Sequence, residues 1–317
     1  MSNSVNKIMI QPSTKKVKLN DDSESENADR LSNLPDCVII HILSLLNTKH
    51  AVQTSVLSSR WNHLWKRIPA LILHSSDFST YQIFTIFVSR VLSLRDSSIA
   101  LHTLDFKRRN RRFEPNIERI VSYAISHNVQ RIGLSVNGHI ADILPSTFSS
   151  QTLTHLKLSI YNGGRRHETL FPKSLNLPSL TNLQLGDFAF GVDGNGCAEP
   201  FSTFNRLNSL LISNCIVRGA YTLCISSVTL VNLTMYNDIY NFYIIDLCTP
   251  SLCKFVFTGT PYHGLSLGSS VSSLKHVDID AEVISYLKEP PLILFCWLQM
   301  FSNIKSLTVS TTTLQVP

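Results

Sequence analysis

Leu207-Asn-Ser-Leu210-Leu-Ile212-Ser-Asn-Cys215-Ile-Val217 is the stretch that decides the fold of this chain. Leu210 and Ile212 alternate with polar or solvent-facing positions, which places both on one side of a short strand. Leu207 before the strand and Cys215 after it supply further apolar groups. Such a unit leaves an apolar edge that only another copy of the unit can cover. The stretch therefore predicts further copies elsewhere in the chain.

Copies of the apolar triplet L-x-x-L-x-L recur along most of the chain. They are Leu101/Leu104/Phe106, Val129/Ile132/Leu134, Leu153/Leu156/Leu158, Leu180/Leu183/Leu185, Leu207/Leu210/Ile212, Leu230/Leu233/Met235, Leu252/Phe255/Phe257, Leu274/Val277/Ile279 and Ile304/Leu307/Val309. First positions are separated by 28, 24, 27, 27, 23, 22, 22 and 30 residues, close to the ~20–29 residues of leucine-rich repeats. Only the copy at 207–217 carries the Asn/Cys position, so the repeats are degenerate. The sequence predicts an α/β fold: a leucine-rich-repeat solenoid with a curved parallel sheet over residues 71–317.

The residue between the last two apolar positions of each triplet is predicted to face solvent on the open side of the sheet. We expect this row of residues to bind a protein substrate. Its members are Lys157, Gln184, Leu211, Thr234, Val256 and Asp278. Between strands we expect helices or irregular returns, and the clearest helix is predicted for residues 116–127.

Residues 31–68 show helical rather than strand periodicity. Leu34, Val38, Ile42, Leu45 and Leu46 are spaced by three or four residues, which indicates one apolar face. Further short helices are predicted for residues 49–57 and after Ser58-Ser59. Helices of this size bury their apolar stripes poorly by themselves. We therefore expect part of this apolar surface to meet a partner.

This helical segment resembles a known family. Leu31-Ser-Asn-Leu34-Pro35-Asp36, followed by Thr54-Ser-Val-Leu57-Ser-Ser59-Arg60-Trp61-Asn-His-Leu64-Trp65, is similar to the F-box of plant F-box/leucine-rich-repeat proteins. Leu175-Asn-Leu177-Pro178-Ser-Leu180 also resembles that family. The resemblance covers roughly residue 30 to the end.

The resemblance implies an F-box over residues 30–70 that binds a SKP-type adaptor, and through it a cullin and a RING subunit of a ubiquitin ligase. The repeats would then present an unidentified protein substrate for ubiquitination, with no cofactor and no catalytic residue in this chain. The residues implied as adaptor contacts are Leu34, Pro35, Val38, Ile42, Leu46 and Trp61. Many relatives continue into a further C-terminal domain, so we expect either a short family member or a truncated one.

Residues 1–29 are polar and charged, and we expect a disordered arm. Lys15, Lys16 and Lys18 within it resemble a nuclear import signal. No apolar stretch has the length of a signal peptide or a membrane span, so we expect the nucleus and cytoplasm rather than a membrane. The 7 cysteines form no C-x-x-C pair, so we expect reduced core thiols and no metal site.

Two alternatives to the ligase hypothesis stay open. The repeats could serve as an interaction scaffold without ligase function. The net charge of +6 arises in residues 49–112, with a basic run at residues 107–112, which could bind nucleic acid. This second alternative is the less favoured one, because such runs are more often solvated loops.

Overall fold

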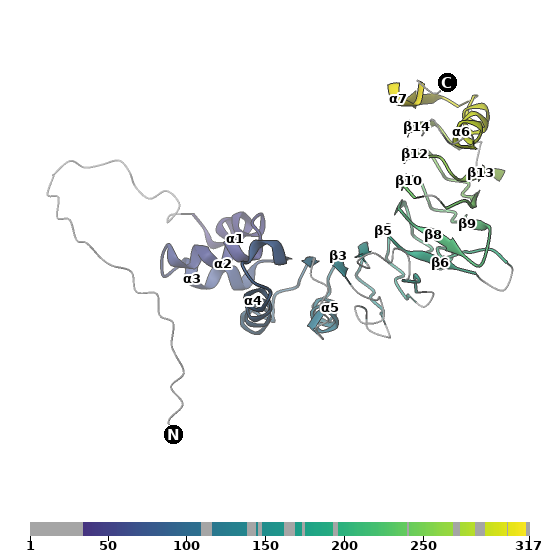
Figure 1. Cartoon of the computed structure of the whole chain (residues 1–317). Coiled ribbons are helices and arrows are strands. Elements are labelled where there is room, and N and C mark those ends of the chain that lie inside the picture. Colours follow the sequence, from purple (N-terminus) through teal and green to yellow (C-terminus); the bar gives the residue numbers. More distant parts are fainter. Residues whose placement is uncertain are drawn as a thin grey trace, which may run out of the picture.

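The computed structural model describes residues 34–108, 116–137, 144, 148–161, 169–172, 175–192, 196–239, 241–268, 273–282, 289–302 and 304–314. Two parts can be distinguished along the chain: a helical unit near its beginning and a long parallel sheet (Figure 1). The sheet bends along its length, so that its last strands run up from the earlier ones (Figure 1).

The main sheet has ten strands in the order β1-β2-β3-β4-β5-β7-β10-β12-β14-β15, and every neighbouring pair is parallel. Its strands are β1 (Ala70–His74), β2 (Thr103–Arg108), β3 (Arg131–Asn137), β4 (His155–Tyr161), β5 (Asn182–Gly186), β7 (Ser209–Ser213), β10 (Asn232–Asn237), β12 (Lys254–Gly259), β14 (His276–Ala281) and β15 (Ser306–Val309). Each predicted triplet lies at a strand from β2 to β15, which confirms the solenoid.

The strands align without slippage, so the apolar positions of successive triplets form two continuous rows. Leu104 pairs with Ile132 and Phe106 with Leu134, and the same alignment continues strand by strand to Leu307 and Val309. Residues of these rows from β1 to β14 are almost fully buried. Because side chains alternate across a strand, the residues between the two rows face the opposite side of the sheet.

A second layer covers the buried face of the sheet. Its elements are α4 (Tyr81–Leu94), α5 (Asn116–Ser126), the short strands β6 (Ala189–Gly191), β8 (Ile216–Arg218), β9 (Thr222–Ser226), β11 (Ile244–Cys248) and β13 (Gly264–Ser266), and α6 (Glu289–Met300). Phe84 of α4 packs on Phe106 with ring centroids 5.7 Å apart, and Trp297 of α6 packs edge-on against Phe257 at 4.8 Å. The core is thus continuous from the first strands to the last. The short α7 (Thr311–Leu314) lies next to β14 through hydrogen bonds of Thr313.

Left-handed residues turn the chain after two central strands. Asp187 follows β5 with φ 64°, and Asn214 follows β7 with φ 49°. Asn and Asp tolerate this conformation better than other residues with a Cβ atom. The backbone N–H of Asp187 donates to the carbonyl of Ser213 in β7, and that of Asn214 donates to the carbonyl of Tyr236 in β10. Each turn is therefore hydrogen-bonded to the following repeat.

The helical unit consists of α1 (Asp36–Ser44), α2 (Thr48–Gln53), the 3-10 turn η1 (Thr54–Val56), α3 (Trp61–Leu64) and the 3-10 turn η2 (Trp65–Arg67). It docks directly on the sheet. The Thr48 hydroxyl accepts from the Ile72 backbone N–H at 2.8 Å, and Asn47 Nδ2 donates to Asp77 at 3.0 Å, in the 3-10 turn η3 (Ser75–Asp77). The repeats therefore cover part of the apolar surface that we expected a partner to cover.

Arg95 fastens the junction between the helical unit and the repeats. Its Nη2 donates to the carbonyls of Ala100 at 2.9 Å and Ile68 at 3.3 Å, while Nη1 donates to Ile99 at 2.9 Å. The side chain is buried with 5% exposure, so its charge is solvated by carbonyl oxygens in place of water.

Strand β1 crosses the predicted domain boundary at residues 70/71, and the helical unit and the repeats share one core, while the boundary itself stays a prediction. Two other expectations need correction. The helix predicted at residues 116–127 is confirmed as α5, but α4 and α6 were not predicted. All 7 cysteines are free, yet only Cys215 is buried, so most are not core thiols.

Candidate functional site

The predicted apolar face of the first helix points outward. Ile39 and Leu43, one turn apart, are fully buried, whereas Val38 is 39% exposed and Leu45 at the end of α1 is 73% exposed. Pro35, before the helix, is also exposed. The helix thus has two apolar faces: the Ile39/Leu43 face is fully buried, and the face of Val38 and Leu45 keeps much of its surface exposed.

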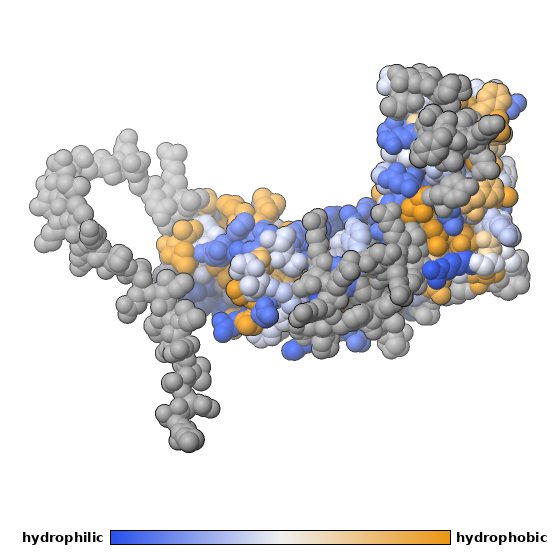
Figure 2. All heavy atoms as spheres, viewed as in Figure 1, coloured by the Kyte–Doolittle hydropathy of each residue, from blue (hydrophilic) through white to orange (hydrophobic). Residues whose placement is uncertain are grey.

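Leu34, Ile42 and Leu46 are half-buried residues beside this face, and Leu34 and Leu46 also pack against the core. Five of the six adaptor contacts implied by the family resemblance therefore lie at the surface. The structure adds two exposed apolar residues that the sequence pattern does not indicate, Val56 with 85% exposure and Leu57 with 64%. Figure 2 shows hydrophobic residues gathered over the end of the molecule where α1–α3 lie. We call Leu34, Pro35, Val38, Ile42, Leu45, Leu46, Val56 and Leu57 the helical-unit surface.

Trp61 differs from the other predicted contacts because it is buried, and its role as an adaptor contact stays a prediction. Its side chain is only 6% exposed and belongs to the core together with Leu64 and Trp65. The first turn of α3 faces the helical unit itself, so the indole cannot reach a partner without rearrangement. Trp61 supports the helical-unit surface from below.

Arg60 holds the first residues of the helical unit in place. Its Nη2 lies 2.7 Å from Asp36 Oδ1 in an ion pair and also donates to the Leu34 carbonyl, while its Nε donates to Asp36 at 3.0 Å. Pro35 lies between these two anchors with φ −58° and ψ 148° as the N-cap of α1. The Leu-Pro step is thereby held in one conformation at the surface.

The open face of the sheet carries the predicted substrate-binding row in register. Lys157 pairs with Gln184, Gln184 with Leu211, Leu211 with Thr234, Thr234 with Val256, and Val256 with Asp278. All are exposed or half-buried, which fits the predicted outward direction. The row is a geometric fact, and nothing in the structure shows what binds it.

Charge is distributed unevenly along this face. Lys157 and Asp278 mark opposite ends of the row, and the residues between them are uncharged. Beside Lys157, partial burial and the positive charge of Arg131 lower the pKa of His155. Tyr236 of β10 donates from its hydroxyl to the Asp238 carboxylate, and this hydrogen bond raises the pKa of Tyr236.

The basic run at residues 107–112 does not form one surface in the part that the structure describes. Lys107 is exposed and pairs with Asp105 at 3.3 Å on the open face. Arg108 points to the opposite face and is 2% exposed. Residues 109–112 lie outside the described residues. Lys107 and Arg108 therefore lie on opposite faces of the sheet and cannot both follow one nucleic-acid backbone.

Among the described residues, no group of three or more His, Cys, Asp and Glu side chains could hold a metal ion. None of the described helices has the length and hydropathy needed to cross a bilayer. The predicted arm at residues 1–29, with Lys15, Lys16 and Lys18, lies outside the described residues.

Comparison with known proteins identifies the helical unit. Residues 31–72 match the F-box domain family. The chain is 32% identical over 67% of its length to a putative F-box/FBD/LRR-repeat protein of Arabidopsis thaliana, covering 48% of that protein. It is 27% identical over 91% of its length to an Arabidopsis thaliana F-box/LRR-repeat protein, covering 63% of it. A putative FBD-associated F-box protein of the same plant is 31% identical over 51% of this chain and is covered over 35% of its length.

The chain thus spans about half the length of the curated relatives that it matches. No solved structure gives a significant match.

Proposed function

We propose that this chain, which belongs to the plant F-box/leucine-rich-repeat family, is the substrate-recognition subunit of an SCF-type ubiquitin ligase. The helical-unit surface binds a SKP-type adaptor, which connects it to a cullin and a RING subunit. The open face of the sheet binds the protein to be ubiquitinated. The chain supplies no catalytic group and acts by holding the substrate near a charged thioester on another subunit.

The observation that carries this proposal is the exposed apolar part of the helical-unit surface. Leu45, Val56 and Leu57 keep 64% to 85% of their surface in water, so they contribute little to the core of the isolated chain. Burying such a side chain at an interface is worth about 1–2 kcal/mol. A surface of this kind on a short helical unit is suited to a partner that supplies a groove for a helix.

The register of the sheet supports the substrate role. A row of side chains that runs across many parallel strands presents a long, rigid surface whose backbone is fully hydrogen-bonded. The uncharged middle of the row between Lys157 and Asp278 favours a partner with apolar or polar contacts there and opposite charges at its ends. A folded protein surface, or an extended segment with charged residues at its two ends, would offer such contacts.

The adaptor proposal is tested by the affinity of the full chain for a purified plant SKP-type adaptor, measured by calorimetry. Val38→Asp with Leu45→Asp should weaken binding by at least ~30-fold, because each places a charge in a desolvated interface. Ile83→Asp on α4 is the matched control, since Ile83 is 49% exposed outside the helical-unit surface. It should leave the affinity within ~3-fold of the unmodified chain.

If the unmodified chain does not bind the adaptor, the ligase proposal fails and the scaffold alternative replaces it. Equal losses for the α4 control and the α1 variant would show that the binding surface has been placed wrongly.

Localisation in the nucleus and cytoplasm is part of the proposal and is tested separately. The full chain fused to a fluorescent reporter should lose nuclear enrichment when Lys15, Lys16 and Lys18 are changed to Ala. Unchanged distribution would remove the import signal from the account.

A further inference from the structure

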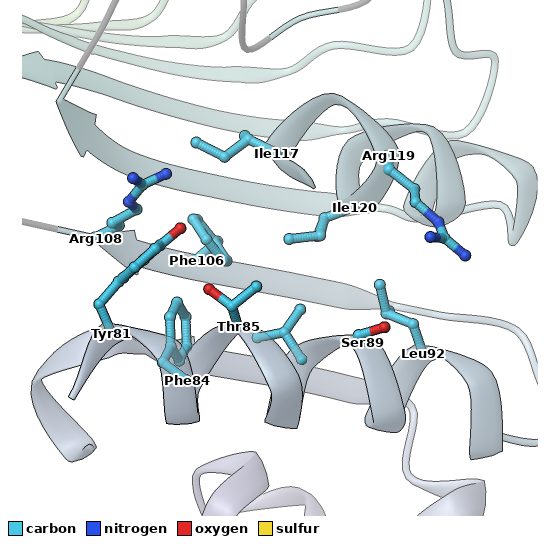
Figure 3. Close-up of a pocket in the computed structure, with 11 residues that line it drawn as sticks. Tyr81, Phe84, Thr85, Ser89, Leu92, Phe106, Arg108, Ile117, Arg119 and Ile120 are labelled. Carbon is cyan, nitrogen blue, oxygen red and sulfur yellow. The ribbon is translucent and has the colours of Figure 1, made fainter. Parts of the chain in front are cut away.

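A pocket lies between α4, β2 and α5, on the layer opposite the open face. Phe84, Val88, Phe106 and Ile120 form apolar walls, and Tyr81 with Arg108 closes one end (Figure 3). Arg119 lies at the other end, near Ser89 and Leu92 (Figure 3). The cavity is partly open to solvent and has a volume of about 30 Å³, room for about two water molecules at ~10–15 Å³ each.

Arg108 occupies a position where the repeat pattern requires an apolar residue. Leu104, Phe106 and Arg108 alternate onto the buried face of β2. In the aligned strands the partner of Arg108 is Val136, and the partner of Val136 is Ile160; both are buried and apolar. A guanidinium in this buried row therefore departs from the apolar pattern of the neighbouring strands, and apolar packing does not explain its presence.

The charge of Arg108 is incompletely satisfied within the described part of the chain. The side chain is 2% exposed, and neither its Nε nor its Nη2 has a hydrogen-bond partner. Its guanidinium carbon lies 4.4 Å from the centroid of the Tyr81 ring, a contact that offsets part of the desolvation cost. Buried charges are otherwise paired, because an unpaired one is costly.

The two unpaired atoms define the missing partner. Nε–H and the outer Nη2–H point to the same side of the planar guanidinium, and this edge matches the two oxygens of a carboxylate. The neighbouring walls are aromatic and aliphatic, so they suit an apolar group attached to that carboxylate. A cavity of this volume encloses little more than the carboxyl group, so the chain of the ligand lies along the apolar walls toward the open side of the pocket.

We propose that this pocket binds a small organic carboxylate, with the carboxylate on the Nε/Nη2 edge of Arg108 and the apolar part between Phe84, Phe106 and Ile120. The ligand lies on the face opposite the substrate-binding row and away from the helical-unit surface. This site is independent of the ligase proposal, and each could fail without the other.

The test measures binding of butanoate and hexanoate to the full chain by ligand-observed NMR at constant ionic strength. Butanamide and hexanamide, which have nearly the same shape without the charge, are the matched ligands. The carboxylates should bind with dissociation constants in the millimolar range or tighter, and the amides at least ~10-fold more weakly. Arg108→Met, which keeps an unbranched side chain, should remove this preference and leave amide binding unchanged.

Lys107→Met is the matched variant, because it removes one positive charge from the neighbouring residue on the opposite face of β2. It should keep the full preference for carboxylates. Equal losses in both variants would overturn the proposal in favour of a general attraction of anions. Inorganic phosphate competing as well as hexanoate would also overturn it, since phosphate does not use the apolar walls.

Stability without ligand gives an independent readout. Arg108→Met and Arg108→Val both remove the unpaired buried charge, and Arg108→Val introduces the residue found at the paired position Val136. Each variant should melt at the same temperature as the unmodified chain or at a higher one. A lower melting temperature in both variants would show that Arg108 already has a partner within the protein and would overturn the proposal. Failure of either carboxylate to bind the unmodified chain would do the same.

Discussion

Arg60 and Asp36 connect the two ends of the helical unit, with Nη2 and Oδ1 2.7 Å apart. Arg60 precedes α3 and Asp36 begins α1, and both side chains remain 36–50% exposed. Ion pairs as exposed as this one contribute little to stability. Arg60 also donates a hydrogen bond to the Leu34 carbonyl. The ion pair matters because Arg60, held by Asp36, positions the Leu34-Pro35 step on the helical-unit surface.

Arg60→Met should therefore affect binding more than folding. We expect the free energy of unfolding to fall by less than ~1 kcal/mol, while the affinity for the SKP-type adaptor falls by ~10-fold because the Leu-Pro step is no longer fixed. Urea denaturation and calorimetry measure the two quantities. Equal adaptor affinity in the variant would show that the step needs no support from Arg60.

Trp61 and Leu57 should behave in opposite ways. Trp61→Ala leaves a cavity in the core and should lower the free energy of unfolding by about 3–5 kcal/mol. Leu57→Ala removes an exposed group and should change it by less than ~0.5 kcal/mol, while weakening adaptor binding. A stable Trp61→Ala protein with weakened adaptor binding would support Trp61 as a direct contact.

Gly259 at the end of β12 should tolerate no side chain. Its φ is +109°, and an added Cβ would come within 2.2 Å of the Asn237 carbonyl oxygen. Gly259→Ala should cost at least ~2 kcal/mol in urea denaturation. Gly196→Ala is the control, because Gly196 also has positive φ, at +76°, but an added Cβ there meets no atom within 4 Å. Equal costs at both glycines would show that the contact with Asn237 relaxes without penalty.

His263 should make stability depend on pH. It is fully buried and stacked on Tyr243 at 3.9 Å, and burial lowers the pKa of His263 to about 3. Below the ordinary His pKa of ~6.5, the unfolded chain takes up a proton that the folded chain does not. The folded state therefore loses stability as pH falls from about 6.5 towards 3.

The comparison with His263→Phe isolates this effect. Between pH 7 and pH 5.5 the unmodified chain should lose about 1.2 kcal/mol more than the variant, from ~1.4 kcal/mol per proton and pH unit. Parallel stability curves for the two proteins would show that His263 is protonated, or solvated, in the folded state.

The strand register could be predicted because two periodic patterns in the sequence determine it. Alternation within a strand and recurrence every 22 to 30 residues together placed Lys157, Gln184, Leu211 and their neighbours in one row, and the structure shows that row. Strand β1 was missed because Ala70–His74 is almost continuously apolar, and such a run shows no alternation.

The side of a helix that faces the core could not be predicted where both sides are apolar. In α1 the Val38/Leu45 face and the Ile39/Leu43 face satisfy helical spacing equally well, and only tertiary packing distinguishes them. Trp61 came from the family resemblance instead, which does not indicate whether a residue is buried in the isolated chain. The burial of Arg108 could have been predicted from its spacing, because the position two residues beyond Phe106 again faces the core. It was not predicted, because a run of basic residues is more typical of a solvated loop.

Hydrogen exchange of the full chain with and without the SKP-type adaptor locates the adaptor-binding surface without substitutions. We expect protection of backbone amides within residues 34–46 and 54–57, with the open face of the sheet unchanged. Protection confined to the strands from β3 to β14, or no change in the helical unit when the complex has formed, would show that the adaptor does not bind the helical-unit surface.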